Sequence, residues 1–235
     1  MRPALFRLTL TAWLMSVAIP GAAIGGPFED ASAAFTRGDY ATALGLLRPL
    51  AEQGLAKAQH ALGAMYDHGW GVPQNYAEAL KWYRLAADQG DVLAQNSLGS
   101  MYHGGNGVGQ DSGEALKWYR LAADQGSVAA QNNLGEMYLN GNGVRQDHAE
   151  ALKWFRKAAD QGLAVAQNNL GLMYAQGQGV PRDYVQAHMW FNLAASQGNF
   201  RRSVKARDAI ASLMTPAQIA EAQRLAREWK PKPER

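Results

Sequence analysis

The chain has 235 residues, of which 47% are hydrophobic, so its composition supports an ordered core. It has no cysteine, which excludes disulfide bonds, a thiol nucleophile, a cysteine-ligated zinc site and an acylated lipoprotein cysteine. The net charge of +3 is uneven, since residues 24–200 hold 12 Lys and Arg against 16 Asp and Glu, whereas residues 201–235 hold nine against four. Because the body of the chain lacks a basic face, we expect no nucleic acid partner.

Residues 1–25 are typical of a secretory signal peptide. Arg2 and Arg7 give a positive start, an apolar run of twelve residues ends at Ile19, and small residues around Ala23 offer a cleavage site near residues 23–25. A membrane-spanning helix needs about 20 residues, so we expect cleavage rather than an anchor. The mature protein is then expected in the periplasm or outside the cell, with no transmembrane span.

Residues 26–54 predict a short helical hairpin that caps the start of the fold. Apolar residues keep helical spacing on both sides of a tight turn at 37–40. Pro49 lies late in the second helix, where we expect it to bend or fray the helix.

A unit of 36 residues then recurs four times, at 55–90, 91–126, 127–162 and 163–198. Fifteen of its positions carry the same residue in every copy, among them the pair Leu134-Gly135 and its equivalents. A fixed period of this length is the signature of a repeat array. Residues repeated in this way are expected to pack against their neighbours.

Each copy predicts two helices. In the third copy Ala130, Leu134 and Met137 share one face of the first helix, and the glycines of 140–143 end it. Asp147 begins the second helix with Glu150 three residues later, a spacing that predicts a reciprocal capping box. Equivalent pairs stand in the other copies: Asn75 and Glu78, Asp111 and Glu114, Asp183 and Gln186.

The interior of each pair combines small and large residues. Gly135 leaves room on the first helix, and we expect Trp154 and Phe155 of the second helix to pack opposite it. Residues 199–235 follow the last copy, and Thr215, Pro216 and Gln218 mark a helix start within them. We expect this segment to form capping helices over the open end of the array, followed by an exposed tail.

The repeated pattern AxAQxxLGxMYxxGxGVxxDxxxALxWYRxAAxQG resembles the Sel-one-like repeat (SLR) family, a relative of the tetratricopeptide repeat (TPR). The resemblance covers 55–198 closely and 28–54 loosely. It implies an all-α fold, a right-handed superhelical solenoid of antiparallel helix pairs that acts as a protein-interaction scaffold. Bacterial relatives are commonly exported and serve in envelope signalling, cell-surface assembly or host contact.

No set of residues predicts catalysis, a cofactor or a metal site. The five histidines fall at five different repeat positions, and no two of them form the i,i+4 pair that suggests a metal site. We expect them at the surface or in loops. No serine begins an S-x-x-K motif. The glycine-rich segment 104–109 has the wrong spacing for a phosphate loop and follows a helix, which indicates a turn.

The candidate site is therefore a binding surface on the concave side of the superhelix, lined by variable positions of the first helices. At position 6 stand His60, Asn96, Asn132 and Asn168; at position 10, Ser100, Glu136 and Leu172; at position 13, His103 and Leu139. The asparagines can donate to and accept from the backbone of an extended peptide. The alternative is that asparagine is only a tolerated polar residue there.

The function that this reasoning favours is an exported scaffold that binds a protein or peptide partner, and we expect it to be a monomer and not an enzyme. One alternative is an enzyme on the same scaffold, acting in cell-wall or β-lactam hydrolysis. Another is a structural bridge in the envelope, with the basic tail in contact with an anionic polymer or lipid.

Overall fold

The computed structural model describes residues 26–198 and 201–232, and every regular element in these ranges is an α-helix. The helices are α1 (Pro27–Thr36), α2 (Tyr40–Glu52), α3 (Ala56–His68), α4 (Tyr76–Asp88), α5 (Val92–Gly104), α6 (Ser112–Asp124), α7 (Val128–Asn140), α8 (His148–Asp160), α9 (Ala164–Gln176), α10 (Tyr184–Ser196), α11 (Arg201–Ala211) and α12 (Pro216–Glu228). The predicted all-α solenoid of antiparallel helix pairs is confirmed. The predicted signal peptide lies outside the described residues.

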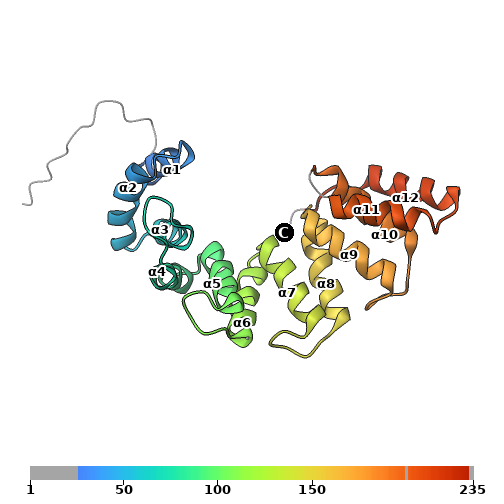
Figure 1. Ribbon diagram of the computed structural model, residues 1–235, viewed down its shortest axis with the longest axis horizontal. Coiled ribbons are helices and arrows are strands. Elements are labelled where there is room, and N and C mark those ends of the chain that lie inside the picture. Colours follow the sequence, from blue (N-terminus) through green and yellow to red (C-terminus); the bar gives the residue numbers. More distant parts are fainter. Residues whose placement is uncertain (1–25, 199–200, 233–235) are drawn as a thin grey trace, which may run out of the picture.

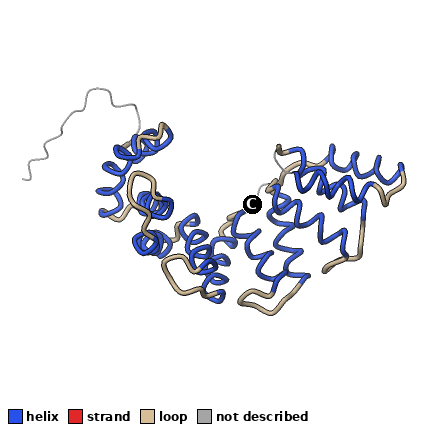
Figure 2. The backbone as a smooth tube through the Cα atoms, in the orientation of Figure 1, coloured by secondary structure: helices blue, strands red, loops and turns tan. Residues whose placement is uncertain are grey.

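The repeats give helices of one length stacked in order. Each of α3 to α10 has 13 residues. The two helices of a repeat pack on each other, and the second helix packs on the first helix of the next repeat. The result is an open arc, with α3, α5 and α7 toward its inner side and α4 and α6 toward its outer side (Figure 1). Only short loops separate the helices (Figure 2).

Helix ends follow the sequence signals, with one correction. The Asp147 side chain accepts hydrogen bonds from the backbone N–H groups of Ala149 and Glu150, which are otherwise unpaired at a helix start. The predicted return half of the box does not form there, nor at the starts of α4, α6 and α10. In α8 the Glu150 carboxylate is instead ion-paired with Lys153 at 3.2 Å, and α4 and α6 have the equivalent ion pair. The full reciprocal box forms instead at the start of α12, between Thr215 and Gln218.

Two glycines of each repeat have separate roles in the loop. Gly141 ends α7 in the left-handed conformation, with φ of 73°. Gly143 allows the loop to touch the preceding repeat, because a Cβ atom there would lie 2.4 Å from the carbonyl oxygen of Ser112 at the start of α6. The equivalent glycine in 104–109, Gly107, is held in the same way against Tyr76, so this segment is a packed turn and not a phosphate loop.

The small residue of the first helix meets a ring of the second helix of the same repeat. A Cβ atom on Gly135 would lie 2.6 Å from the ring of Phe155, which is fully buried. The same contact joins Gly63 to Tyr83, Gly99 to Tyr119 and Gly171 to Phe191. Trp154, also expected opposite Gly135, is not among the nearest atoms there; it lies in an apolar cluster with residues of α6 and with Leu134 and Met137 of α7. Trp154 thus contributes to the cluster that its own repeat shares with the preceding one.

Polar side chains also join the repeats. Gln131 donates to the carbonyl oxygen of Ala123 in the preceding repeat at 3.4 Å and accepts from Gln161 of its own repeat at 2.9 Å. The Arg120 guanidinium donates to the hydroxyl of Tyr138 in the next repeat and lies over its ring. Both arrangements recur along the array, so these repeated side chains fix how one repeat sits on the next.

The two ends of the arc depart from the repeat. At the first end Pro49 lies inside α2, which continues to Glu52. At the other end α11 and α12 both pack on α10, and the ring of Trp229 meets Trp190 at 6.2 Å. The chain then returns across the array, where the backbone N–H of Lys232 donates to the carbonyl oxygen of Asp160.

One histidine differs from the sequence-based expectation. His188 is 3% exposed within α10, and it is neither at the surface nor in a loop. Burial lowers its pKa, and the nearby positive charge of Arg207 lowers it further, while Asp208 opposes both. The imidazole is therefore held in its neutral form as part of the packing beneath α11.

The Gly135–Phe155 contact gives a first prediction. Gly135→Ala should destabilise the fold by about 1–3 kcal/mol, because the added methyl group forces the buried ring to move. Gly109→Ala is the control, since a Cβ atom there meets nothing within 4 Å and its φ is not positive. Urea unfolding of the two variants measures the difference, and equal midpoints would contradict the close-packing model.

Candidate binding surface on the concave side

The inner surface of the arc is formed by the side of each first helix that no second helix covers. Ser100, Glu136 and Leu172, all at position 10, are exposed there. His60 and His103 are half-buried, as is Leu139. These residues lie on α3, α5, α7 and α9, the first helices of four successive repeats. That their side chains line one inner surface stays a prediction.

The position-6 asparagines are engaged within the fold. Asn133 donates to the side-chain carbonyl oxygen of Asn96 at 3.2 Å, and Asn169 donates to that of Asn132 at 3.2 Å. Each bond joins position 7 of one repeat to position 6 of the preceding repeat. Asn132 is only 5% exposed. The prediction that Asn132 contacts a peptide directly is therefore revised, because its side chain lies beneath the surface.

Glu136 and the capping helix extend this asparagine network. Glu136 accepts from Asn132 at 2.9 Å and from Asn169 at 3.4 Å. At the last repeat the hydroxyl of Ser203, on α11, donates to the side-chain carbonyl oxygen of Asn168 at 2.8 Å. The side-chain carbonyl oxygens of these asparagines, which the sequence-based hypothesis assigned to peptide binding, thus already accept hydrogen bonds within the chain. Binding through these asparagines stays a prediction, and Ser100, Glu136 and Leu172 are the accessible members of the candidate site.

An apolar hollow lies at the first end of the inner surface. Its volume is about 260 Å³, and Phe35 of α1, Leu47 of α2 and Trp70 after α3 line it together with His60, Ala61 and Ala64. The ring of Phe35 meets that of Trp70 edge to face at 5.1 Å. Burial lowers the pKa of His60, with Asp91 opposing, so a neutral imidazole borders the hollow.

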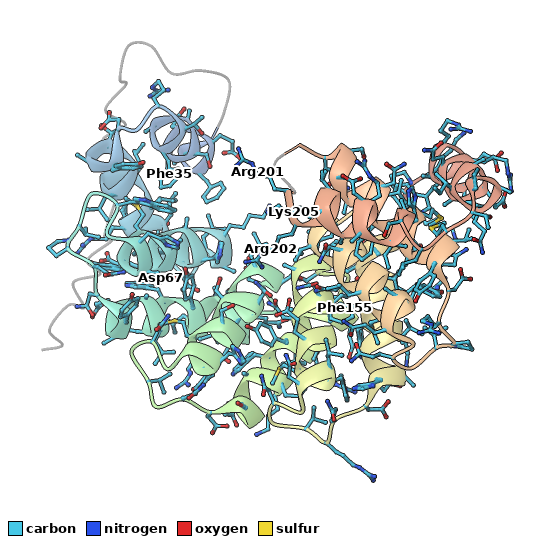
Figure 3. The ribbon with its side chains drawn as sticks, turned by 45° about the vertical axis from the view of Figure 1, so that its right-hand side comes forward. Phe35, Asp67, Phe155, Arg201, Arg202 and Lys205 are labelled. Atoms are coloured by element: carbon cyan, nitrogen blue, oxygen red, sulfur yellow. The ribbon has the colours of Figure 1, made fainter. Side chains whose placement is uncertain are left out.

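The other end of the inner surface is basic. Arg201, Arg202 and Lys205 are exposed on α11 (Figure 3). Their side chains extend into the space between the two arms of the arc, and Phe35 extends into the same space from the opposite arm. The sequence-based hypothesis treated the basic residues of 201–235 as a tail. The sequence does not show how α11 packs against α10, so it does not show which way these cations extend.

Two tyrosines with raised pKa are structural hydrogen-bond donors. Burial raises the pKa of Tyr83 and of Tyr119, which keeps both phenols protonated. The Tyr119 hydroxyl donates to Ser100 at 3.1 Å, and that of Tyr83 donates to Asp67 at 3.3 Å. Protonated phenols that support the inner surface are not activated nucleophiles.

Neither a metal-binding cluster nor a membrane-spanning helix is found among the described residues, 26–198 and 201–232. No group of three or more His, Asp or Glu residues there is arranged to hold a metal ion. In the same ranges no helix is both long enough and apolar enough to cross a membrane.

The asparagine network gives a second prediction. Asn132→Ala should destabilise the fold by about 1–3 kcal/mol, because it removes buried hydrogen bonds and leaves their partners unpaired. The control is Asn140→Ala, an exposed asparagine at the end of α7, which should change stability little. Thermal unfolding compares the two, and equal melting temperatures would show that the network has no structural role.

Comparisons with known proteins agree with this architecture. The model of the Sel1 repeat family matches residues 56–91, 92–127, 128–163 and 164–199, which confirms the resemblance seen in the sequence with a shift of one residue. A search of curated proteins found no match.

Several crystal structures are similar to this chain. A protective antigen of uropathogenic Escherichia coli with an SLR fold is 37% identical, with a TM-score of 0.80 over 86% of this chain and 44% of its own. This chain thus spans less than half of that structure. A Sel1 repeat protein from Oxalobacter formigenes is 32% identical, with a TM-score of 0.71 over 86% of this chain and 83% of its own.

A third crystal structure has a lower sequence identity to this chain, and its similarity shows the fold alone. A sel1 repeat protein from Klebsiella pneumoniae is 22% identical, with a TM-score of 0.53 over 79% of this chain and 91% of its own. The four matched repeats extend over more than half of the residues and correspond to the helix pairs α3–α4, α5–α6, α7–α8 and α9–α10. The chain belongs to the Sel1 repeat family.

Proposed function

We propose that this protein is an exported scaffold that binds a partner protein along the inner surface of its arc and has no catalytic activity of its own. One contrast supports the proposal. The residues identical in all four repeats are used in packing and in bonds between repeats, whereas position 10 is accessible and reads Ala64, Ser100, Glu136 and Leu172. A surface that varies on a constant frame is suited to selecting one partner.

The family supports the coarser part of this proposal. Sel1 repeats typically mediate protein–protein interaction, and a solenoid offers an extended concave surface to a partner. The finer part, a role in envelope signalling or assembly, rests on the expectation that residues 1–25 direct the chain out of the cytoplasm.

A third prediction tests the inner surface. The variant Ser100→Arg/Leu172→Arg places two bulky cations on α5 and α9 and should abolish capture of the partner from the native envelope by the tagged protein. Its matched control is Leu85→Arg/Leu121→Arg, because these leucines are 42% and 49% exposed on the second helices α4 and α6. Capture of the same partner by the inner-surface variant, or its loss in the control alone, would refute the assignment.

Export gives a fourth prediction. The full-length chain, expressed with a C-terminal tag in a Gram-negative host, should appear in the periplasmic or extracellular fraction with a new N-terminus near residues 24–26. Replacing Leu10 and Leu14 by Arg should keep it in the cytoplasm, because a charged h-region no longer enters the secretion pathway. Cell fractionation and N-terminal sequencing give the answer, and an unprocessed cytoplasmic protein would refute export.

A further inference from the structure

Three cations on the inner side of α11 have no partner within the fold. In the described part of the chain, the side chains of Arg201, Arg202 and Lys205 form no hydrogen bond or ion pair, whereas their neighbour Arg207 is paired with Asp208 at 2.8 Å. All three are exposed and extend into the space between the arms (Figure 3). Like charges that share one face repel each other, so this arrangement gains stability only from an anionic partner.

The opposite arm of the arc offers a different chemistry. The hollow beside Phe35 and Trp70 has walls that are mostly apolar, and its volume of about 260 Å³ is that of a pocket for a side chain. Phe35 extends from α1 toward the space into which the three cations extend from α11 (Figure 3). A partner that follows the inner surface from end to end would therefore meet an apolar pocket at one end and positive charge at the other.

The middle of the inner surface does not share the positive charge. Glu136 is exposed on α7, and Asp67, nearer the hollow, lies at the end of α3 with its side chain 23% exposed. Residues 24–200 as a whole carry a net charge of −4, from 12 Lys and Arg against 16 Asp and Glu. An anionic group is therefore favoured beside the three cations of α11 and disfavoured beside Glu136, which sets the direction in which the ligand lies.

From this distribution we propose that the partner contributes an acidic segment in an extended conformation. Its carboxylates bind Arg201, Arg202 and Lys205, and an apolar side chain farther along the segment enters the hollow beside Phe35. The inference rests on the proposed function, and it adds the chemistry and direction of the ligand. Arginine is suited to this role because its planar guanidinium can bind a carboxylate through two hydrogen bonds.

The position of the cations favours a protein segment over an anionic membrane. A membrane surface is flat on the scale of this molecule, whereas the cations lie on the inner side of a curved array, opposite another arm (Figures 1 and 3). A membrane also offers no apolar side chain to a hollow formed between α1 and α3. A flexible segment can enter the space and reach both features.

The test uses fluorescein-labelled synthetic peptides and fluorescence anisotropy with the mature chain, residues 26–235. Each peptide carries one leucine, a Gly-Ser linker and three glutamates, with linkers of about 4, 8 and 12 residues in both directions, since an extended chain spans about 3.3–3.6 Å per residue. At least one peptide should bind more tightly than its counterpart with three glutamines. Raising the salt concentration should weaken that binding, because the attraction is between exposed charges.

Two pairs of variants locate the ends of the peptide. Arg201→Gln/Arg202→Gln/Lys205→Gln should weaken binding about tenfold or more. The control Lys81→Gln/Lys117→Gln/Lys153→Gln removes the same charge from exposed positions on α4, α6 and α8 and should change affinity less than about twofold. Ala64→Leu narrows the hollow and should weaken the leucine peptide but not a peptide with serine in its place. Circular dichroism checks that each variant keeps its helices.

Several results would overturn the inference. One is that no glutamate peptide binds better than its glutamine counterpart. Another is that both triple variants lose affinity equally. A third is that vesicles with about 30% phosphatidylglycerol bind through the three cations while the peptides do not, which would assign this surface to a membrane. If partner capture needs Ser100 and Leu172 but not the cations, the proposed function stands and the acidic-segment inference fails.

Discussion

The contact between a glycine of the first helix and a ring of the second helix determines how closely each pair of helices packs. With no side chain at Gly135, the ring of Phe155 lies within 2.6 Å of where a methyl group would stand, and three more repeats make the same contact. Beside it, Leu134 and Met137 are almost without exposed surface, in a cluster that includes Trp154 of the second helix and residues of α6. Each pair is thereby a constant unit, and the curvature of the arc follows from stacking such units.

The bonds between units explain why so many residues are identical while so few are available for recognition. Gln131 uses its amide group to contact the preceding repeat and its carbonyl group to accept from Gln161. Trp154 reaches into the cluster of α6 and α7, and the loop at Gly143 rests on the start of α6. A substitution at any of these positions disturbs two repeats together. The positions left to vary include position 10 on the first helices, together with loop residues and exposed positions of the second helices.

The sequence predicts the parts of this fold that depend on local chemistry. The period of 36 residues, the Asx caps such as Asp147 and the glycine that ends each first helix are all read correctly, because each signal lies within one helix and its neighbours in the chain. Which ring lies nearest to Gly135 is not predicted, because Trp154 and Phe155 look equivalent until the angle between helices is known. The return half of the capping box also fails in all four repeats, and in three of them the glutamate is ion-paired with a lysine three residues later.

The candidate site shows the same division. Position 6 was singled out because it is polar and lies on the inner face, but the sequence does not show that Asn133 lies against Asn96, 37 residues earlier. That spacing is one residue more than the period, so a search for polar pairs offset by one position would have found both this pair and Asn132 with Asn169. The side of α11 that carries Arg201 has no such signal, because α11 lies outside the repeat.

The ends of the array therefore have a freedom that its middle lacks. A residue within a repeat must pack within its own helix pair and against the next pair, whereas α1 and α11 each have one side with no repeat beyond it. The hollow beside Phe35 lies where α1 and α2 meet the first repeat, and Arg201, Arg202 and Lys205 lie on α11. Between them the curvature of four constant units sets the distance that a ligand must span. The frame thus supplies the length and direction of the binding surface, and the capping helices supply the charge and the pocket that distinguish one ligand from another.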